Sequence, residues 1–338
     1  MRAALLVEFG SDLRVEEIPR PTAGKGQVLV RVEACGVCHS DLHLARGHWE
    51  RFKQQMQLPR VLGHEVAGKV VEIGPGVKNL QEGQPVGVAW FHHTCGSCHY
   101  CNRDLEVFCH EPAVTGVDVN GGLAEYLVAW SSHVIPIPDG VPLKSAAPLF
   151  CAGGTVYSAL QKVNLKSAHL GIWGVGGLGH LALELGRIGG ARITVVDVNP
   201  EKLALAEDLG ADTVILASEA SGWFEDLKNK VDVALVAATS IEAYSSALQG
   251  LHKNGSLLAV GLPSDPLPWT APDLVRSGIR IIPSRVSSRE ELRRLLSLAA
   301  NRQIEARVNS YPLEQINHVL SELEEGRISG RAVIAFEE

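Results

Sequence analysis

The chain has 338 residues, more than one hydrophobic core usually contains, and this length predicts two domains. Its 46% hydrophobic and 20% charged residues are typical of a soluble globular protein, and a net charge of -7 argues against a basic surface for nucleic acid. No apolar run reaches the roughly 18 residues that a membrane span needs.

Short β-type runs broken by glycine and proline fill the first 150 residues. Residues 1–7 have the pattern of a strand and not that of a signal peptide. Further runs cover residues 27–32, 65–73 and 124–128. This texture predicts a compact, mostly antiparallel β domain.

From about Thr155 strands and helices alternate, which predicts an α/β fold with a doubly wound parallel sheet. Pro200 after Asn199 is a favourable helix start, because the missing N–H would have no partner there. The predicted strands are residues 169–173, 192–197, 213–216, 231–236, 256–260 and 278–282. The predicted helices are residues 178–188, 200–209, 241–249 and 289–299, and the tail adds a helix at 313–323 and a strand at 331–336.

A glycine-rich segment follows the predicted strand 169–173 and opens the next helix with the pattern G-x-G-x-x-G. Such a turn lets backbone and a helix N-terminus approach a pyrophosphate. The next strand ends at Asp197, where a carboxylate accepts from both ribose hydroxyls and repels a 2′-phosphate. This context favours a dinucleotide-binding site over the alternative, a glycine-rich turn with a surface aspartate. It also favours NAD over NADP as the cofactor. The glycines concerned are Gly174, Gly176, Gly177 and Gly179.

Four cysteines lie close together with spacings of two, two and seven residues: Cys95, Cys98, Cys101 and Cys109. Four thiolates at such spacing suit one closed, tetrahedral zinc site that holds a loop. The alternatives are a disulfide-bonded or disordered loop and a zinc ribbon that binds nucleic acid or protein. An odd total of seven cysteines fits free thiols in a reducing cytoplasm better than disulfides. Arg103 is the one base within residues 95–109, and this lack of a basic cluster argues against a zinc ribbon that binds nucleic acid.

Two further cysteines, Cys38 and Cys151, lie far apart in the sequence, with His64 and Glu65 between them. A Cys/His/Cys set from distant segments suits an open zinc site with room for water or substrate. Spacing alone does not join these segments, because a single cysteine is more often a small buried hydrophobic residue.

Several motifs together resemble the zinc-containing medium-chain alcohol dehydrogenases of the bacterial and yeast type. They run in the family's order over nearly the whole chain: residues 36–43 (GVCHSDLH), 63–65 (GHE), the four-cysteine lobe, 151–157 (CAGGTVY), the glycine-rich loop and 330–333 (GRAV). The resemblance implies a GroES-like catalytic domain at 1–152 with a structural-zinc lobe at about 92–112, a Rossmann domain at 153–285, and a segment 286–338 that returns to the first domain.

The resemblance also implies two zinc ions per subunit, with Cys38, His64 and Cys151 holding the catalytic one and Glu65 as an occasional ligand. At such a zinc an alcohol loses its proton near neutral pH and passes a hydride to NAD. Further implied roles concern the proton and the imidazole ligand: Asp41 accepts from His64, Ser40 passes the alcohol proton on, and His43 carries it to solvent as general base.

Cofactor contacts follow from the same resemblance. His39 and Arg331 match cations at the pyrophosphate, Thr155 and Leu178 pack on the nicotinamide, and Lys202 lies near the adenosine ribose. Two tryptophans, Trp49 and Trp90, match aromatic positions that narrow the alcohol pocket. The segment 50–58 departs from the family by being longer and more polar, which affects substrate size, and Cys35 is left over as a buried residue beside the ligand loop.

These features predict an NAD-dependent zinc alcohol dehydrogenase for small primary or secondary alcohols, in the cytoplasm, as a homo-oligomer in which a tetramer is favoured over a dimer. One alternative is a polyol, formaldehyde or aryl-alcohol dehydrogenase on the same scaffold. A more distant alternative is a non-catalytic zinc-binding interaction protein, against which every ligand and relay position is present in the sequence.

Overall fold

The computed structural model describes residues 1–263, 265–267 and 269–336, and these form two compact units. The first unit contains residues 1–154 and the chain from Ser287 onward, and the second contains Thr155–Val286. Within the described residues, every helix is too short or too polar to cross a membrane.

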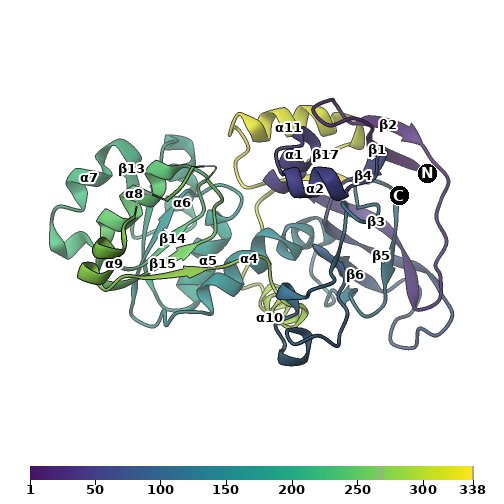
Figure 1. Cartoon of the computed structure of the whole chain (residues 1–338), viewed down its shortest axis with the longest axis horizontal. Coiled ribbons are helices and arrows are strands. Elements are labelled where there is room, and N and C mark those ends of the chain that lie inside the picture. The colour runs from purple at the N-terminus through teal and green to yellow at the C-terminus, as the bar shows by residue number, and fades with distance from the viewer. Residues whose placement is uncertain (264, 268, 337–338) are drawn as a thin grey trace. The chain divides into compact units, whose positions relative to one another are not determined.

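The first unit is built on a mostly antiparallel sheet in the order β10-β6-β5-β3-β18-β17, with β9 also paired to β3. Figure 1 shows its strands β3, β5 and β6. A smaller sheet, β2-β1-β4, and a β7-β8 pair complete its strands. The strands are β1 (Arg2–Leu6), β2 (Arg14–Glu17), β3 (Gln27–Val37), β4 (Arg60–Val61), β5 (Glu65–Ile73), β6 (Pro85–Val88), β7 (Phe91–His93), β8 (Ala113–Val114), β9 (Tyr126–Trp130), β10 (Ile135–Pro136), β17 (Val308–Tyr311) and β18 (Arg331–Ala335).

Helices and 3-10 turns lie in the connections between these strands. They are α1 (His39–Arg46), α2 (Glu50–Gln55), α3 (Leu143–Ala146), α10 (Arg289–Ala300) and α11 (Ile316–Glu324), with the 3-10 turns η1 (Cys101–Arg103), η2 (Glu106–Phe108), η3 (Ala147–Phe150) and η6 (Leu313–Gln315). The helix α4 (Ala152–Leu160) begins in the first unit and ends in the second. The long strand β3 is the centre of this unit, because it pairs with β5, β9 and β18.

The second unit contains one fully parallel sheet in the order β13-β12-β11-β14-β15-β16, which confirms the predicted doubly wound fold. Its helices α5, α6 and α8 pack against these strands (Figure 1). The elements are β11 (His169–Trp173), α5 (Gly179–Ile188), β12 (Arg192–Asp197), α6 (Pro200–Asp208), β13 (Thr213–Leu216), η4 (Ala217–Glu219), α7 (Ala220–Trp223), η5 (Leu227–Asn229), β14 (Val231–Val236), α8 (Ile241–Gly250), β15 (Leu251–Ala259), α9 (Ala271–Ser277) and β16 (Arg280–Pro283).

The first four strands predicted for this unit are confirmed residue for residue, and other boundaries shift for local reasons. β15 begins at Leu251, before the predicted Ser256. The helix α9 has no predicted counterpart, because it has only seven residues and none of them is buried, so it lacks a periodic apolar face. In the tail, residues 313–315 form a 3-10 turn after Pro312, so α11 starts at Ile316. Asn199 caps α6 with its side chain, as the following proline led us to expect.

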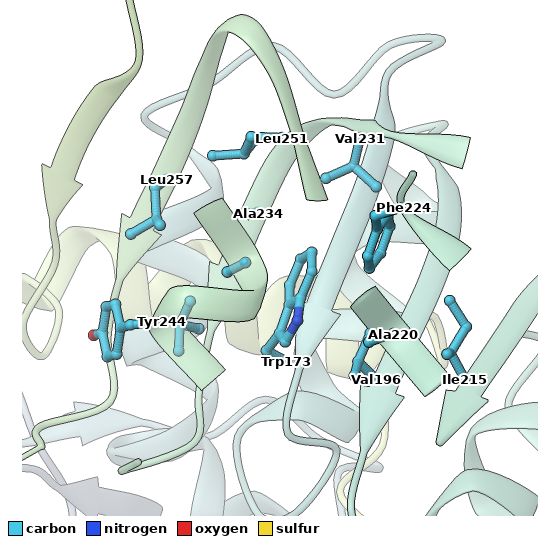
Figure 2. Close-up of a cluster of buried hydrophobic side chains, with 12 residues drawn as sticks. Trp173, Val196, Ile215, Ala220, Phe224, Val231, Ala234, Tyr244, Leu251 and Leu257 are labelled. Carbon is cyan, nitrogen blue, oxygen red and sulfur yellow. The ribbon is translucent and has the colours of Figure 1, made fainter. Parts of the chain in front are cut away.

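A cluster of buried hydrophobic side chains surrounds Trp173 in the second unit (Figure 2). Trp173 at the end of β11 is 1% exposed, and its ring stacks on Phe224 at a centroid distance of 5.6 Å. Its indole N–H donates to Ser246 Oγ at 3.0 Å, so that the one polar atom of the ring is also satisfied. The residue directly before the glycine-rich loop is therefore fixed by packing on one face of the sheet.

We predict that Trp173→Ala lowers the free energy of unfolding by about 3–5 kcal/mol, because it leaves a large cavity in this cluster. Thermal unfolding should show a decrease in Tm of about 10 °C. The matched control is Trp223→Ala, since Trp223 in the same unit is 40% exposed and should change Tm little. Equal effects of the two substitutions would contradict the role given to burial.

Candidate functional site

The register of β3 brings the dispersed candidate ligands together. Gly36 on β3 lies opposite Glu65 on β5, so Cys38 and His64 stand just beyond the same end of this strand pair. On its other side β3 pairs with β18, where Val37 lies opposite Ala332. Arg331 therefore reaches the same place from the C-terminal segment.

Cys151 arrives at this cluster by a different route. It follows the turn η3, whose last residue, Phe150, is 2% exposed. The Phe150 ring fills the space where a side chain on Gly87 would stand, since a Cβ there would lie 1.8 Å from the ring. This packing against β6 anchors η3 and thereby fixes the position of the next residue, Cys151.

One ligand atom from each of Cys38, His64, Glu65 and Cys151 lies within 4.8 Å of the others. The Cys38 sulfur is 3.5 Å from His64 Nε2. Two sulfurs and one imidazole nitrogen form a donor set that suits zinc, and the structure thus assembles the residues that the sequence left apart. Cys35 is fully buried but lies outside this set.

Asp41 organises three parts of the cluster at once. Its carboxylate accepts from His64 Nδ1 at 3.2 Å, from the Gly63 amide at 3.2 Å and from the Cys38 amide at 2.9 Å. The bond to Nδ1 leaves Nε2 of His64 directed at Cys38, the orientation that a metal ligand needs. Cys38 is also the N-cap of α1, where its sulfur accepts from the Ser40 amide at 3.2 Å.

Burial and neighbouring charges strongly perturb the protonation of the cluster. The hydrogen bond from Cys151, followed by the charge of His64, lowers the pKa of Cys38 well below that of an ordinary thiol, and the pKa of Cys151 is raised in return. Burial alone would lower the pKa of His64, but Asp41 and Cys38 raise it above its usual range. The two sulfurs thus divide one proton unequally, as expected of thiols crowded into a cation-binding position.

Glu65 and Arg331 form a buried ion pair beside the sulfurs, with exposures of 0% and 2%. One carboxylate oxygen accepts from the guanidinium, and the other, Oε2, has no partner among the described residues. Burial raises the pKa of Glu65 to about 7, although Arg331 opposes the shift. Gly36 makes room for this carboxylate, because a Cβ there would lie 2.0 Å from Oε2. A free, buried oxygen next to the ligand set fits the predicted occasional ligand.

The remaining predicted residues of the first unit lie on or near α1. Ser40 and His43 are half-buried, His39 is exposed, and the predicted contact of Arg331 with the pyrophosphate stays a prediction. Trp90 stands edge-on to His64 at 4.8 Å, and Trp49 lies 5.1 Å from His43.

Phe52 is a residue that the sequence did not single out. It lies between the two tryptophans, 5.7 Å from Trp49 and 5.9 Å from Trp90, so that an aromatic row runs from His43 to His64. The segment 50–58, noted above for its length, begins with α2 (Glu50–Gln55), and this helix supplies the ring. The available signal was one aromatic residue within an otherwise polar helix turn.

The four-cysteine lobe also brings its sulfurs together within 4.8 Å. The Cys95 sulfur lies 4.0 Å from that of Cys101 and 3.6 Å from that of Cys109. A tetrahedron with zinc–sulfur bonds of about 2.3 Å has edges of roughly 3.8 Å, so these separations fit a structural zinc. Backbone hydrogen bonds, first from Cys101, lower the pKa of Cys98 to about 6, which favours the thiolate form that a metal requires.

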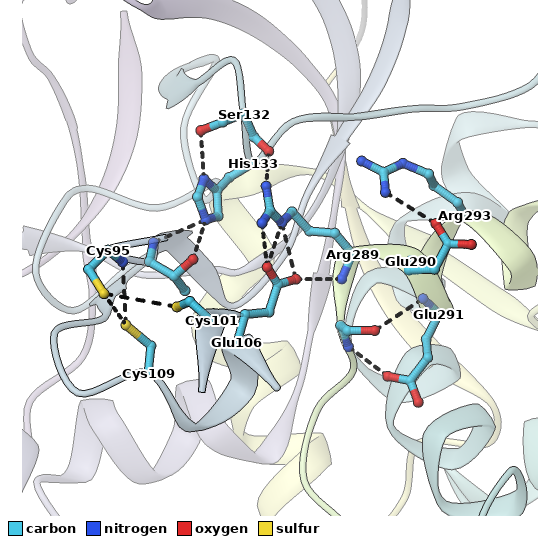
Figure 3. A network of polar contacts seen from close by, with 12 residues as sticks. Cys95, Cys101, Glu106, Cys109, Ser132, His133, Arg289, Glu290, Glu291 and Arg293 are labelled. Carbon is cyan, nitrogen blue, oxygen red and sulfur yellow. Dashed lines mark hydrogen bonds and ion pairs between the residues drawn. The ribbon is translucent and has the colours of Figure 1, made fainter. Parts of the chain in front are cut away.

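An ion pair ties this lobe to the start of α10 (Figure 3). The Arg289 amide and Nε donate to the Glu106 carboxylate at 2.8 and 3.1 Å, and another guanidinium nitrogen donates to the carbonyl of Ser132 at 2.5 Å. Ser132 is followed by His133, which accepts from the Thr94 amide beside Cys95. The sequence gives no sign of this network, because Glu106 and Arg289 are 183 residues apart and neither belongs to a motif.

In the second unit, the glycine-rich loop has the geometry of a phosphate-binding turn. Gly174 adopts a φ of +90°, and a Cβ on Gly179 would lie 1.9 Å from the Gly174 carbonyl oxygen. A Cβ on Gly176, by contrast, would meet only Lys202 Nζ at 4.0 Å. Packing therefore explains the first and last glycines, whereas Gly176 leaves backbone accessible to a ligand, as a pyrophosphate requires.

Asp197 holds this loop through its carboxylate. It accepts from the Val175 amide at 2.7 Å and from the Asn199 amide at 2.9 Å, and its side chain is buried. Lys202 lies over the loop at Gly176, which places it near the predicted dinucleotide. Thr155 is buried on α4, and Leu178 precedes the first residue of α5.

Comparisons with known proteins agree with this arrangement. Residues 24–139 match the alcohol dehydrogenase GroES-like domain, and residues 177–301 match the zinc-binding dehydrogenase domain. An alcohol dehydrogenase of Geobacillus stearothermophilus is 39% identical over 337 residues, which cover 99% of each chain. The alcohol dehydrogenase structure from the archaeon Aeropyrum pernix has a TM-score of 0.92 at 34% identity and covers 99% of this chain and 100% of its own. Acetophenone reductase from Geotrichum candidum, in complex with NAD, has a TM-score of 0.88 at 29% identity, covering 99% and 97%.

We predict that Glu106→Gln lowers the free energy of unfolding by about 2 kcal/mol near neutral pH, because it removes charged hydrogen bonds to Arg289. Burial opposes ionisation of Glu106, but Arg289 holds the pKa of that carboxyl below its usual value. A depressed pKa stabilises the fold above the unfolded-state pKa, and this contribution is lost as the pH falls through the folded-state pKa.

The Tm difference between wild type and Glu106→Gln should therefore disappear in acid. The control is Glu290→Gln, since the side chain of Glu290 is 57% exposed and its ion pairs contribute little. A difference that persists unchanged at low pH would show that the charge of Glu106 is not responsible.

Proposed function

The chain belongs to the zinc-containing alcohol dehydrogenases, and we propose that it is an NAD-dependent enzyme that interconverts small primary or secondary alcohols with aldehydes or ketones. The convergence of Cys38, His64 and Cys151 with a carboxylate-held imidazole carries this proposal. A zinc ion held by these residues would lower the pKa of an alcohol, while NAD would accept the hydride.

The chain's own residues position and deprotonate the alcohol. Asp41 fixes the tautomer of His64 through the contact with Nδ1. In this proposal Ser40 receives the alcohol proton and His43 takes it as general base. Burial, and then the charge of His48, lower the pKa of His43, so the imidazole is available as a base at neutral pH.

Two features of the second unit support NAD as the cofactor. The open position at Gly176 suits a pyrophosphate, and Asp197 at the end of β12 is an acceptor for ribose hydroxyls. A 2′-phosphate in the same place would meet the buried carboxylate of Asp197, which disfavours NADP.

Three aromatic side chains support a short substrate. Trp49, Phe52 and Trp90 form a continuous row that ends on the ligand His64. Rigid rings next to the ligand set restrict the volume available to the carbon chain of an alcohol.

We further propose a homo-oligomer, with a tetramer favoured, in the cytoplasm. All seven cysteines are free thiols, which fits a reducing compartment. Within the described residues β16 is an edge strand, and Leu262 and Val275 in the same unit are 66% and 82% exposed, as expected of a unit with a surface that another subunit covers.

Purified enzyme should form NADH from NAD with short alcohols and should contain two zinc ions per chain. Cys151→Ala should lose one zinc and reduce turnover by at least about a hundredfold, with Tm largely kept. Cys98→Ala should also lose one zinc but lower the Tm instead. A panel of short, branched, polyol and aromatic alcohols identifies the substrate class. Absence of NADH formation with the entire panel, from protein holding both zinc ions, would falsify the proposed activity.

We predict that Asp197→Gly raises the ratio of kcat/KM for NADP to that for NAD by about tenfold or more, because the repulsive carboxylate is removed. Steady-state kinetics with both cofactors measure this ratio. Asp212→Gly is a suitable control, since Asp212 accepts from the Ile193 amide at the start of the same strand. An unchanged ratio in Asp197→Gly would remove the ribose assignment.

A further inference from the structure

A second imidazole lies directly on the proposed general base. His48 Nδ1 is 3.1 Å from His43 Nδ1, and the ring centroids are 5.4 Å apart. At this distance one nitrogen donates a proton to the other, so the two rings share a hydrogen bond. His48 lies outside the motifs by which the other site residues were predicted.

The end of α1 fixes this contact through the backbone. Gly47 adopts a left-handed conformation with φ of +69°, and its amide donates to the Leu44 carbonyl at 3.1 Å. The His48 amide turns back to the His43 carbonyl at 3.0 Å. These two bonds form a Schellman motif, which places the residue after the glycine over the one five positions earlier. The contact between the rings is thus built into the helix terminus.

The two rings differ in their access to water. His43 is half-buried, with Trp49 against it at 5.1 Å, whereas His48 is exposed. Within the described part of the chain, no protein atom forms a hydrogen bond with His48 Nε2. The pair therefore leads from a partly enclosed imidazole to one whose far nitrogen meets solvent.

The titratable groups near His43 affect its pKa in opposite directions. Cys38 and His48 are the titratable groups that act on His43, with opposite signs. Glu324 on α11 is held mainly by Arg46, at 2.8 Å, and interacts with the charge of His48 as well. The charged groups beside the pair are therefore Cys38, Arg46 and Glu324.

We propose that His48 is the outer station of the proton relay, receiving from His43 the proton that alcohol oxidation releases and delivering it to water. This inference rests on the proposed function. One proton enters His43, the proton on its Nδ1 moves to Nδ1 of His48, and a proton leaves Nε2 of His48 to water. One proton enters and one leaves for each hydride transferred, and no other reactant is needed. His48 acts through His43 and is a positioning and relay residue, without contact to the substrate.

Three variants separate proton transport from simple support of the His43 ring. His48→Ala removes both the hydrogen bond and the proton path, whereas His48→Asn keeps a polar group near the Nδ1 position but cannot relay a proton. His318→Ala is the control, because His318 is exposed on α11 of the same unit and, within the described residues, forms no hydrogen bond or ring contact with His43.

Steady-state oxidation of the best alcohol should be followed from pH 6 to pH 10 in dilute buffer. Both His48→Ala and His48→Asn should lower kcat near neutral pH by about tenfold, with KM for NAD unchanged. The deficit should shrink as pH rises, since hydroxide then takes the proton from His43 directly. Added imidazole should restore kcat in His48→Ala. The relay proposal would be overturned if His48→Asn had the same kcat as the wild type, or if added imidazole did not raise the kcat of His48→Ala.

A histidine NMR titration of the full-length protein gives a readout that does not depend on turnover. In His48→Ala the pKa of His43 should rise, because the second cation no longer opposes protonation. An unchanged titration of His43 would also contradict the coupled pair. Failure of the proposed function looks different, because wild type would then form no NADH while the pKa of His43 would still rise in His48→Ala.

Discussion

The pairing of β3 with both β5 and β18 is the constraint on which the metal cluster depends. It sets Gly36 opposite Glu65 and Val37 opposite Ala332, so three distant segments end at one place. A slip of one residue in either pairing would turn every side chain of that strand to the opposite face of the sheet. The buried positions along β3, from Val28 to Val37, oppose such a slip, because it would expose apolar residues. The hydrophobic effect thus fixes the location of polar ligands that themselves contribute little to folding.

Burial of charge is the second theme of this unit. Asp41, His64 and Glu65 are fully buried, and Arg331 nearly so. Isolated charges there would be strongly destabilising, but each has a partner of opposite sign or a backbone donor. The thiols complete the balance: the pKa of Cys38 is lowered and that of Cys151 is raised, so a proton must leave when both sulfurs bind a cation. Metal affinity should consequently depend on pH, because metal binding releases this proton.

The parallel sheet and the four-cysteine lobe could be predicted from the sequence alone, whereas the dispersed ligand set could not. The parallel strands were readable because 169–173 and 192–197 are short apolar runs bounded by turn residues, and the four-cysteine lobe because its spacing is local. The dispersed ligands became a set only through a family resemblance, since no spacing rule connects Cys38 with Cys151. Phe52, the Glu106–Arg289 pair and the contact between His43 and His48 were missed, because they depend on tertiary contacts or on the geometry of one helix end.

Asp41 serves two purposes with one carboxylate. It closes the capping box of α1 by accepting from the Cys38 amide, and it also orients the imidazole of His64. A substitution of Asp41 would therefore affect both the start of α1 and the orientation of the His64 imidazole. For a designer who wishes to graft this centre onto another scaffold, the smallest transferable part is not a triad of side chains. It is the continuous segment from Gly36 to Gly47, together with a neighbouring strand that presents His64 in register and a turn that brings in Cys151.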